Sequence, residues 1–260
     1  MLISQVCKQQ DFESVWLQEA CLALKEPLQY HRKLWEYCYI YQGLLERGML
    51  GPGRRGLGFG VGKEPLASLF ASRGCYITAT DLDAPSASVQ GWAQSNMHAV
   101  GIQDLNERGL CDPELFRQRV TFEVVNMNAI PPHLFNQFDF TWSSCSFEHC
   151  GSIALGKQFI LNQMNCLKPG GVAIHTTEFN LSSNDQTLEE GPTVLFRLKD
   201  IEWMVHTLRA QGHSIEVDYS VGTGPIDRHI DVPPHSNPHL RLLLAQYVTT
   251  SIGLIIEKAK

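Results

Sequence analysis

Residues 56–65 read GLGFGVGKEP, with glycine at every second position, Gly58, Gly60 and Gly62, shortly before Pro65. A short apolar run precedes the glycines and a helical pattern follows them, which predicts a strand, a tight loop and a helix. Glycines in such a loop let backbone N–H groups approach a ligand at the helix N-terminus. Pro65 suits the first helical turn, because its missing N–H would have no partner there. The stretch therefore predicts a binding loop at the head of an α/β domain.

A carboxylate follows this loop at the spacing of a nucleoside site. Asp81 ends the apolar run YITATD, nineteen residues after Gly62. At the tip of the second strand, a carboxylate is placed to accept hydrogen bonds from both hydroxyls of a ribose. A tight turn for the glycines and a helix N-cap for Asp81 are the alternatives when each feature is taken alone. Together, in strand–loop–helix–strand order, they favour nucleoside binding.

Short apolar runs alternate with helical stretches over most of the chain, which is typical of an α/β sheet. The runs expected to form strands are residues 54–59, 75–81, 120–126, 138–144, 171–179, 214–220 and 251–259. Helices are expected near residues 64–72, 86–97, 152–167 and 200–211. No helix of crossover length separates the last two strands, so these two strands are expected to pair antiparallel.

Two segments stand apart from this alternation. Residues 1–50 carry helical patterns and are expected to form a helical cap or lid on a domain at 51–260, with Asp11 as the first N-cap. The aromatic helix RKLWEYCYIYQ in this segment is either core or lid. Residues 222–246, unusually rich in Pro and His, are expected to form a loop insertion on the acceptor side.

Composition limits the class of partner. The chain has 260 residues, 43% of them hydrophobic, and a formal net charge of -6, which argues against nucleic acid and anionic membranes and favours small molecules. Without a basic N-terminal region before an apolar run, or an apolar stretch of about 18 residues, the protein is expected to be cytoplasmic. The eight cysteines lack C-x-x-C spacing and are expected to be buried, reduced thiols. The oligomeric state stays open, with a homodimer as one option.

The glycine spacing separates two classes of cofactor. Dinucleotide dehydrogenases use G-x-G-x-x-G, whereas here the third glycine falls one residue earlier, giving GxGxG. Further along, CLKPGGVAIHTTEF predicts a helix that ends at the KPGG turn and then a strand. With these motifs, Asp81 and the reversed last strand, residues 50–260 resemble the class I S-adenosylmethionine-dependent methyltransferases. The resemblance implies a Rossmann-like three-layer αβα sandwich, with a seven-stranded, mostly parallel sheet whose last strand is antiparallel.

The resemblance also implies which residues contact S-adenosylmethionine. They are Gly58, Gly60, Gly62, Asp81, Asn126, Met127 and Ser144. The glycines would lie against the methionine moiety and Asp81 would hold the ribose. Asn126 stands where the family usually has an Asp facing the adenine amine, and an amide oxygen can still accept a hydrogen bond from that amine.

Gly56 departs from the family pattern. Many members carry an acidic residue two positions before the first glycine, where its carboxylate orders the loop and approaches the amino group of the cofactor. Glu64, just past the loop, is the candidate that would bind the cofactor ammonium instead. Its alternative role is to stabilise the helix dipole.

Methyl transfer to a hydroxyl requires a group that removes the proton. His149 follows Glu148 just beyond the strand at 138–144, and the resemblance implies that this loop lines the active site. The alternative is that His149 caps or packs against the next helix. Glu178 lies near the C-terminal end of its strand, where open α/β sheets bind ligands. His229 and His235, in the long loop, are further candidate bases or sugar contacts.

Neither a magnesium site nor a catalytic role for His175 is expected. Asp139, Glu178 and Asn180 could imitate a magnesium site, but Asp139 lies at the wrong end of its strand, so no metal is expected. His175 lies deeper in its strand and is expected to be a hydrogen-bonded core residue.

The sequence thus predicts a methyltransferase, most simply an O-methyltransferase, that acts on a small hydroxylated acceptor. The chain also resembles a subgroup that methylates sugars and surface glycans, in the stretches GLGFGVGKEPL, SSCSFEHCGS and HTTEFNLSSN, so the acceptor class includes carbohydrates. An NAD(P)-dependent oxidoreductase is one alternative. Such an enzyme is expected to have its third glycine one residue later, as in G-x-G-x-x-G, and commonly a Tyr-x-x-x-Lys pair. A catalytically inactive nucleoside-binding domain is the other, and it rests on the missing acid at Gly56.

Overall fold

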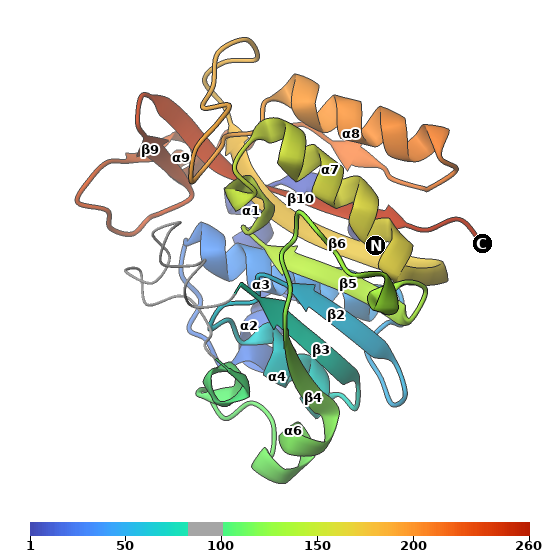
Figure 1. The fold of residues 1–260 in the computed structure, drawn as a ribbon. Helices are drawn as coiled ribbons and strands as arrows, with labels where there is room; N and C mark the ends of the chain where they lie inside the picture. Colours follow the sequence, from blue (N-terminus) through green and yellow to red (C-terminus); the bar gives the residue numbers. More distant parts are fainter. Residues whose placement is uncertain (83–100) are drawn as a thin grey trace.

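The computed structural model describes residues 1–82 and 101–260, so the helix expected near 86–97 lies outside the described residues. At its centre is a mixed sheet of ten strands (Figure 1). Five parallel strands run in the spatial order β4 (Val120–Val124), β3 (Tyr76–Asp81), β2 (Arg55–Phe59), β5 (Phe138–Ser144) and β6 (Leu167–Asn180). The long strand β10 (Tyr247–Glu257) pairs antiparallel with β6, which confirms the reversed last strand.

The edge beyond β10 differs from the sequence expectation. A strand from the N-terminus, β1 (Ser4–Val6), lies between β10 and β7 (Val217–Asp218), antiparallel to the first and parallel to the second. The expected direct pairing of the last two predicted strands is therefore wrong, apart from one bridge between Ser214 and Glu257. The two short strands β8 (Ile230–Asp231) and β9 (Arg241–Leu244) extend the sheet from β10. With β1, β8 and β9 included, the sheet has ten strands in place of the seven expected.

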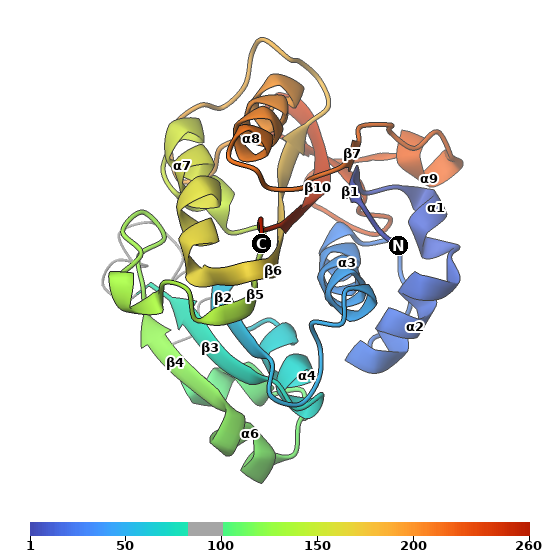
Figure 2. The same cartoon turned by 90° about the vertical axis from the view of Figure 1, so that its right-hand side faces the viewer.

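Helices cover both faces of the sheet, as expected for a three-layer sandwich (Figures 1 and 2). One face carries α3 (Arg32–Glu46), α4 (Leu66–Ser72) and α6 (Pro113–Arg119). The other carries α7 (Ile153–Gln163) and α8 (Leu198–Ala210). The remaining helices, α1 (Gln9–Phe12), α2 (Val15–Leu24) and α9 (Pro225–Arg228), lie outside these layers near the N-terminus (Figure 2).

The N-terminal fifty residues do more than cap the sheet. Besides supplying β1, they place α3 directly on β10, where a Cβ on Gly253 would lie 2.1 Å from the ring of Tyr39. Asp11 is not the expected N-cap, because it lies inside α1 while Ser14 caps α2. The Asp11 carboxylate instead accepts a hydrogen bond from the indole of buried Trp35 at 2.7 Å. A domain boundary at residue 50 stays a prediction.

Two different constraints account for the glycines of the opening stretch. Gly56 and Gly58 lie within β2, and a Cβ on either would overlap an aromatic ring of β5, 2.3 Å from Phe140 or 2.4 Å from Trp142. Gly60 and Gly62 follow the strand with φ of 55° and 50°, in the left-handed region that favours glycine. Packing therefore explains the first pair, and backbone conformation explains the second.

Two further expectations concern cysteines and membranes. All eight cysteines are free thiols, and seven are buried, whereas Cys145 is partly exposed. Among the helices formed by residues 1–82 and 101–260, none is both long and apolar enough to cross a bilayer.

Candidate functional site

A cavity of about 420 Å³ lies at the carboxyl ends of the parallel strands, the position where open α/β sheets bind ligands. Ten of the residues singled out from the sequence line it, namely Gly60, Gly62, Glu64, Asp81, Asn126, Met127, Ser144, Glu148, His149 and Glu178. The structure does not bring Gly58 or His229 to this cavity. Gly58 lies against Trp142, and His229 is exposed at the end of α9.

The glycine loop and the second strand are tied together at the cavity wall. The N–H of Gly62 donates to one carboxylate oxygen of Asp81 at 3.0 Å, and the N–H of Leu82 donates to the other at 2.8 Å. A further backbone bond joins Val61 N–H to the carbonyl of Thr80. These contacts fix the carboxylate of Asp81 beside the backbone of the loop.

The remaining expected cofactor contacts lie at the tips of the neighbouring strands. The side-chain oxygen of Asn126 accepts from the backbone N–H of Asn128 at 2.9 Å, which fixes the orientation of the amide. Met127 is half-buried with its sulfur close to Gly60. The hydroxyl of Ser144 donates to Glu36 at 3.0 Å, so its proton is directed away from the cavity.

Glu64 is a buried acid in the wall of the cavity. It is 5% exposed, and its carboxyl group accepts a hydrogen bond from the indole N–H of Trp142 at 2.7 Å. Burial raises its pKa to about 8, although the hydrogen bond from Trp142 opposes this shift. Phe140 fills the space at Gly56 where the family pattern has its acid. The carboxyl group near the glycine loop is therefore that of Glu64, between the loop and α4, and does not come from position 56 in β2.

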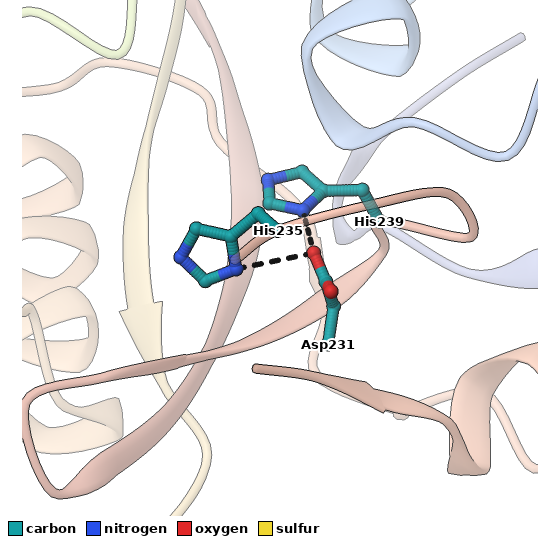
Figure 3. A group of neighbouring side chains, drawn as sticks. All are labelled: Asp231, His235 and His239. Atoms are coloured by element: carbon teal, nitrogen blue, oxygen red, sulfur yellow. Dashed lines mark hydrogen bonds and ion pairs between the residues drawn. The ribbon is translucent and has the colours of Figure 1, made fainter. Parts of the chain in front are cut away.

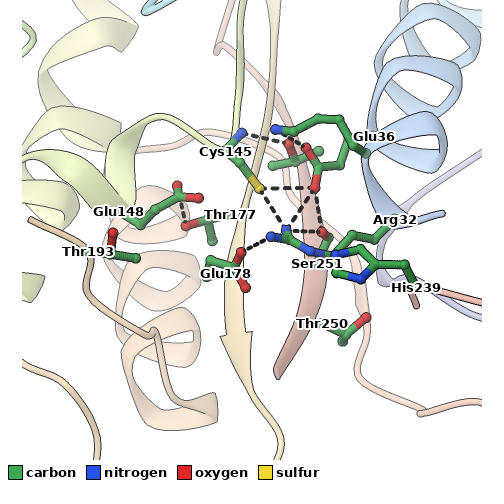
Figure 4. Close-up of polar contacts among 12 residues, drawn as sticks. Arg32, Glu36, Cys145, Glu148, Thr177, Glu178, Thr193, His239, Thr250 and Ser251 are labelled. Carbon is green, nitrogen blue, oxygen red and sulfur yellow. Dashed lines mark hydrogen bonds and ion pairs between the residues drawn. The ribbon is translucent and has the colours of Figure 1, made fainter. Parts of the chain in front are cut away.

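A cluster of charged side chains from α3 forms the floor of the site (Figure 4). Glu36 is fully buried and accepts hydrogen bonds from Lys33 at 2.8 Å, from Arg32 at 3.2 Å and from the thiol of Cys145 at 3.0 Å. Burial alone would raise the pKa of Glu36, but the charges of Lys33 and Arg32 lower it to about 2. The carboxylate of Glu36 is therefore ionised, and it holds both cations at the cavity.

Two other buried carboxyl groups, Glu148 and Glu178, line the cavity. Glu178 forms an ion pair with Arg32 through one oxygen, and Glu148 accepts from the hydroxyl of Thr177 at 2.9 Å (Figure 4). Within the described residues, the second oxygen of each has no hydrogen-bond partner. Burial raises the pKa of both groups, and the charge of Arg32 opposes this for Glu178. Since buried polar atoms are almost always hydrogen-bonded, these oxygens point to a ligand that donates two hydrogen bonds.

His149 is held in one tautomer beside them. Its Nδ1 lies 2.8 Å from the carbonyl of Pro192, which can only accept, so Nδ1 carries the proton and Nε2 has the lone pair. Nε2 is 4.0 Å from the nearer carboxylate oxygen of Glu148. Burial lowers the pKa of His149 to about 4, so the imidazole is neutral at pH 7. A neutral imidazole of this kind can take a proton from an acceptor hydroxyl.

The other residues weighed from the sequence lie elsewhere. His175 is a core residue, as expected, with Nδ1 2.7 Å from the hydroxyl of Ser143. Asp139 lies at the opposite end of β5 and pairs with Lys168. Asn180 holds the following loop through Gln186 and does not line the main cavity.

Sequence reasoning missed the contribution of α3. Arg32, Lys33 and Tyr37 line the cavity. Buried Glu36 accepts hydrogen bonds from Arg32 and Lys33. The available signal was a charged residue, Glu36, inside an otherwise aromatic and apolar run, because charged side chains are rarely buried unless they are paired.

Comparison with known proteins supports the fold. No protein-family model and no curated protein matches the chain. The solved structure of the [4+2]-cyclase SpnF matches with a TM-score of 0.54 and 17% identity, over 100% of this chain and 98% of that chain. Phosphoethanolamine N-methyltransferase 2 of Haemonchus contortus, solved with phosphomonomethylethanolamine and S-adenosylhomocysteine, matches with a TM-score of 0.51 and 17% identity, over 85% of this chain and 53% of that chain.

A third match is 1,6-didemethyltoxoflavin-N1-methyltransferase of Burkholderia thailandensis, with a TM-score of 0.48 and 14% identity, over 97% of this chain and 82% of that chain. The chain has the Rossmann-like fold of the class I S-adenosylmethionine-dependent methyltransferases, which confirms the expected fold class. Because one of these structures is a cyclase, the fold alone does not decide the reaction. That decision rests on the site.

Proposed function

We propose that this protein is an S-adenosylmethionine-dependent methyltransferase that acts on a small hydroxylated molecule, with carbohydrates as the favoured class. The observation that carries the proposal is the meeting of two halves in one cavity. One half is a left-handed glycine loop between Asp81 and the buried acid Glu64. The other is a neutral histidine, His149, beside oxygens of Glu148 and Glu178 that have no hydrogen-bond partner in residues 1–82 and 101–260.

The loop half suits the cofactor. Gly60 and Gly62 would lie against its methionine part, Asp81 would accept hydrogen bonds from the ribose hydroxyls, and Asn126 would face the adenine. Glu64 would bind the ammonium group, because a buried carboxyl with a raised pKa becomes ionised most readily beside a cation. When bound, S-adenosylmethionine supplies a methyl group on a positively charged sulfur.

The other half suits an acceptor with several hydroxyl groups. His149 takes the proton from the reacting hydroxyl through Nε2, while its Nδ1–H stays bound to the carbonyl of Pro192. Glu148 Oε1 and Glu178 Oε2, buried oxygens without a hydrogen-bond partner among the described residues, accept hydrogen bonds from neighbouring hydroxyls of the same acceptor. Arg32 orients Glu178 and lowers the cost of its burial. All of these residues come from one chain, so the proposal does not depend on a homodimer.

Calorimetry with S-adenosylhomocysteine, S-adenosylmethionine and NAD tests the cofactor assignment. One molecule of either adenosyl compound should bind per chain, and NAD should not bind. A panel of polyhydroxylated acceptors and amines, followed by mass spectrometry for added methyl groups, tests the acceptor class. Binding of NAD alone would identify an oxidoreductase. Tight binding of S-adenosylhomocysteine without methylation of any acceptor would support the inactive binding domain.

The role of Glu64 gives a separate prediction. Glu64→Gln keeps an oxygen for the indole of Trp142 but removes the charge. Since a hydrogen bond to a charged group contributes about 1.5–3 kcal/mol, the affinity for S-adenosylhomocysteine should fall by roughly ten- to a hundredfold. Calorimetry in buffers of different ionisation enthalpy should also show that the wild type releases a proton on binding near pH 7 and that the variant does not. Equal affinities would remove Glu64 from the cofactor site.

A further inference from the structure

The end of β8 and the loop that follows it bring together three side chains of types that can ligate a metal (Figure 3). None of the three lines the cavity. Asp231, His235 and His239 are spaced four residues apart, and one ligand atom from each lies within 4.8 Å of the others. The side chain of Asp231 is 3% exposed and that of His239 is 13% exposed, whereas that of His235 is 36% exposed. The cluster therefore has a closed inner wall and one side open to solvent.

Both imidazoles turn Nδ1 toward the same carboxylate oxygen. His235 Nδ1 lies 3.2 Å from Oδ2 of Asp231, and His239 Nδ1 lies closer to that atom. The backbone N–H of Ser236 is shared between the two carboxylate oxygens, 3.1 Å from Oδ1 and 3.2 Å from Oδ2. The two imidazole nitrogens therefore meet at Oδ2. A cation bound between them and the carboxylate would use this arrangement, with both imidazoles presenting lone pairs.

The ligand set points to one class of ion. Two imidazole nitrogens and a carboxylate oxygen are typical ligands of Zn²⁺ and of similar first-row divalent ions. Ligands about 2.1 Å from a tetrahedral zinc ion lie about 3.4 Å apart. The 3.2 Å between His235 Nδ1 and Asp231 Oδ2 is close to this spacing, whereas the closer contact of His239 Nδ1 with the same oxygen would have to lengthen when an ion binds. We propose that Asp231, His235 and His239 bind a zinc-class divalent ion whose fourth position faces solvent.

Such an ion would fix the loop against the beginning of α3. The ring of His239 lies 4.7 Å from that of His31, the N-cap of α3. The backbone N–H of His239 donates to the carbonyl of Tyr30 at 2.8 Å. The carbonyl of His239 accepts from the backbone N–H of Arg32 at 2.9 Å. Because Arg32 lines the cavity, the ion would hold one wall of the site in place. The sequence expectation of no metal considered only carboxylates at the strand tips and not this loop.

Cobalt titration tests the proposal without reference to activity. The untagged full chain is stripped with a chelator, dialysed and titrated with Co²⁺. We expect one Co²⁺ per chain, visible absorption bands of a nitrogen- and oxygen-ligated site, and displacement by one equivalent of Zn²⁺. His235→Ala and Asp231→Asn should each weaken Co²⁺ binding at least tenfold. His229→Ala is the matched control, because His229 is an exposed histidine two residues before Asp231, and its binding should equal the wild type.

Three results would overturn the proposal. The first is the lack of a stoichiometric Co²⁺ spectrum. The second is unchanged binding in His235→Ala, which removes a surface side chain and leaves the buried Asp231 in place. The third is a thiolate-to-cobalt absorption band that disappears in Cys145→Ser, because this would place the ion at the other cluster of potential ligands, Cys145, Glu148 and Glu178. Circular dichroism of each variant shows that the chain is folded in the titration.

Discussion

Glu64 makes the stability of the protein depend on pH. Burial raises the pKa of this carboxyl group from 4.5 to about 8 in the folded chain. Between these values the folded state binds a proton that the unfolded state has lost, so the free energy of unfolding falls as the pH rises. At about 1.4 kcal/mol per pKa unit, the fall is of the order of a few kcal/mol.

Glu64→Gln should remove this fall. Urea denaturation at pH 6 and pH 8.5 should show the wild type losing stability at the higher pH relative to the variant. Glu202→Gln, on the exposed face of α8, is the control and should follow the wild type at both values. Parallel behaviour of the wild type and Glu64→Gln would mean that Glu64 is ionised in the folded chain throughout this range.

His149 is the residue whose removal should affect the reaction more than binding. A general base contributes about a hundred- to ten-thousandfold to the rate, so His149→Ala should lower kcat by that factor and leave the affinity for S-adenosylhomocysteine within about threefold. Because the pKa of His149 is lowered to about 4, kcat/KM of the wild type should decline on the acid side only below about pH 5. A kcat of His149→Ala within tenfold of the wild type would contradict its role as the base.

At the scale of the element, the contact between β2 and β5 explains why the family acid is missing. Gly56 pairs with Phe140 across the two strands, and the ring occupies the space of a Cβ at Gly56. Gly56→Ala should therefore lower the free energy of unfolding by about 1–3 kcal/mol, the usual range for overpacking a core. Gly51→Ala is the control, because a Cβ at Gly51 meets nothing within 4 Å. Denaturation curves that coincide for the two variants would show that Phe140 moves aside at no cost.

The helix α3 shows where sequence patterns stop being informative. The apolar stripe of the run HRKLWEYCYIYQGLLERG predicts a helix with a buried face, and α3 covers this run. The same stripe does not show which face and strands of the sheet the helix will cover. That placement depends on contacts with residues more than 100 positions away, such as the hydrogen bond from the thiol of Cys145 to Glu36. The apolar run around Glu36 indicates that this charge is buried, but the sequence does not show that Lys33 and Glu36 contact Ser144 in the site.

At the scale of the whole molecule, the parallel strands of the sheet could be predicted from the sequence, whereas the strands at the edge beyond β10 could not. Strands β2, β3, β5 and β6 are largely buried runs, and β4 is an edge strand rich in β-branched and aromatic residues, so each has a local signal. Strand β1 has only three residues, Ser4–Val6, too few for a periodic pattern to be recognised. Its place is determined by β10 and β7, which lie over 200 residues further along the chain. Similarly, His229 and His235 were recognised in the loop by residue type, but only the fold brings His235 to Asp231 together with His239, which the sequence did not single out.

The position of β1 gives a prediction for the whole sheet. Val6 is 1% exposed, pairs with Ile252 of β10 and belongs to the apolar layer between the sheet and α8, so Val6→Asp would place a carboxylate in that layer. Burial of an unpaired charge is strongly unfavourable, and the free energy of unfolding should fall by about 3 kcal/mol or more. Release of β1 would also leave β10 with an unpaired edge, and such edges promote association between chains.

Chemical denaturation and light scattering of Val6→Asp measure both effects of releasing β1. The control is Val15→Asp in α2, where the side chain is 69% exposed and an acidic residue in the first helical turn is favourable. It should remain within about 0.5 kcal/mol of the wild type and stay free of aggregation. If the two variants unfold at the same denaturant concentration, β1 contributes little to stability, and the pairing of β6 with β10 is sufficient to hold this edge of the sheet.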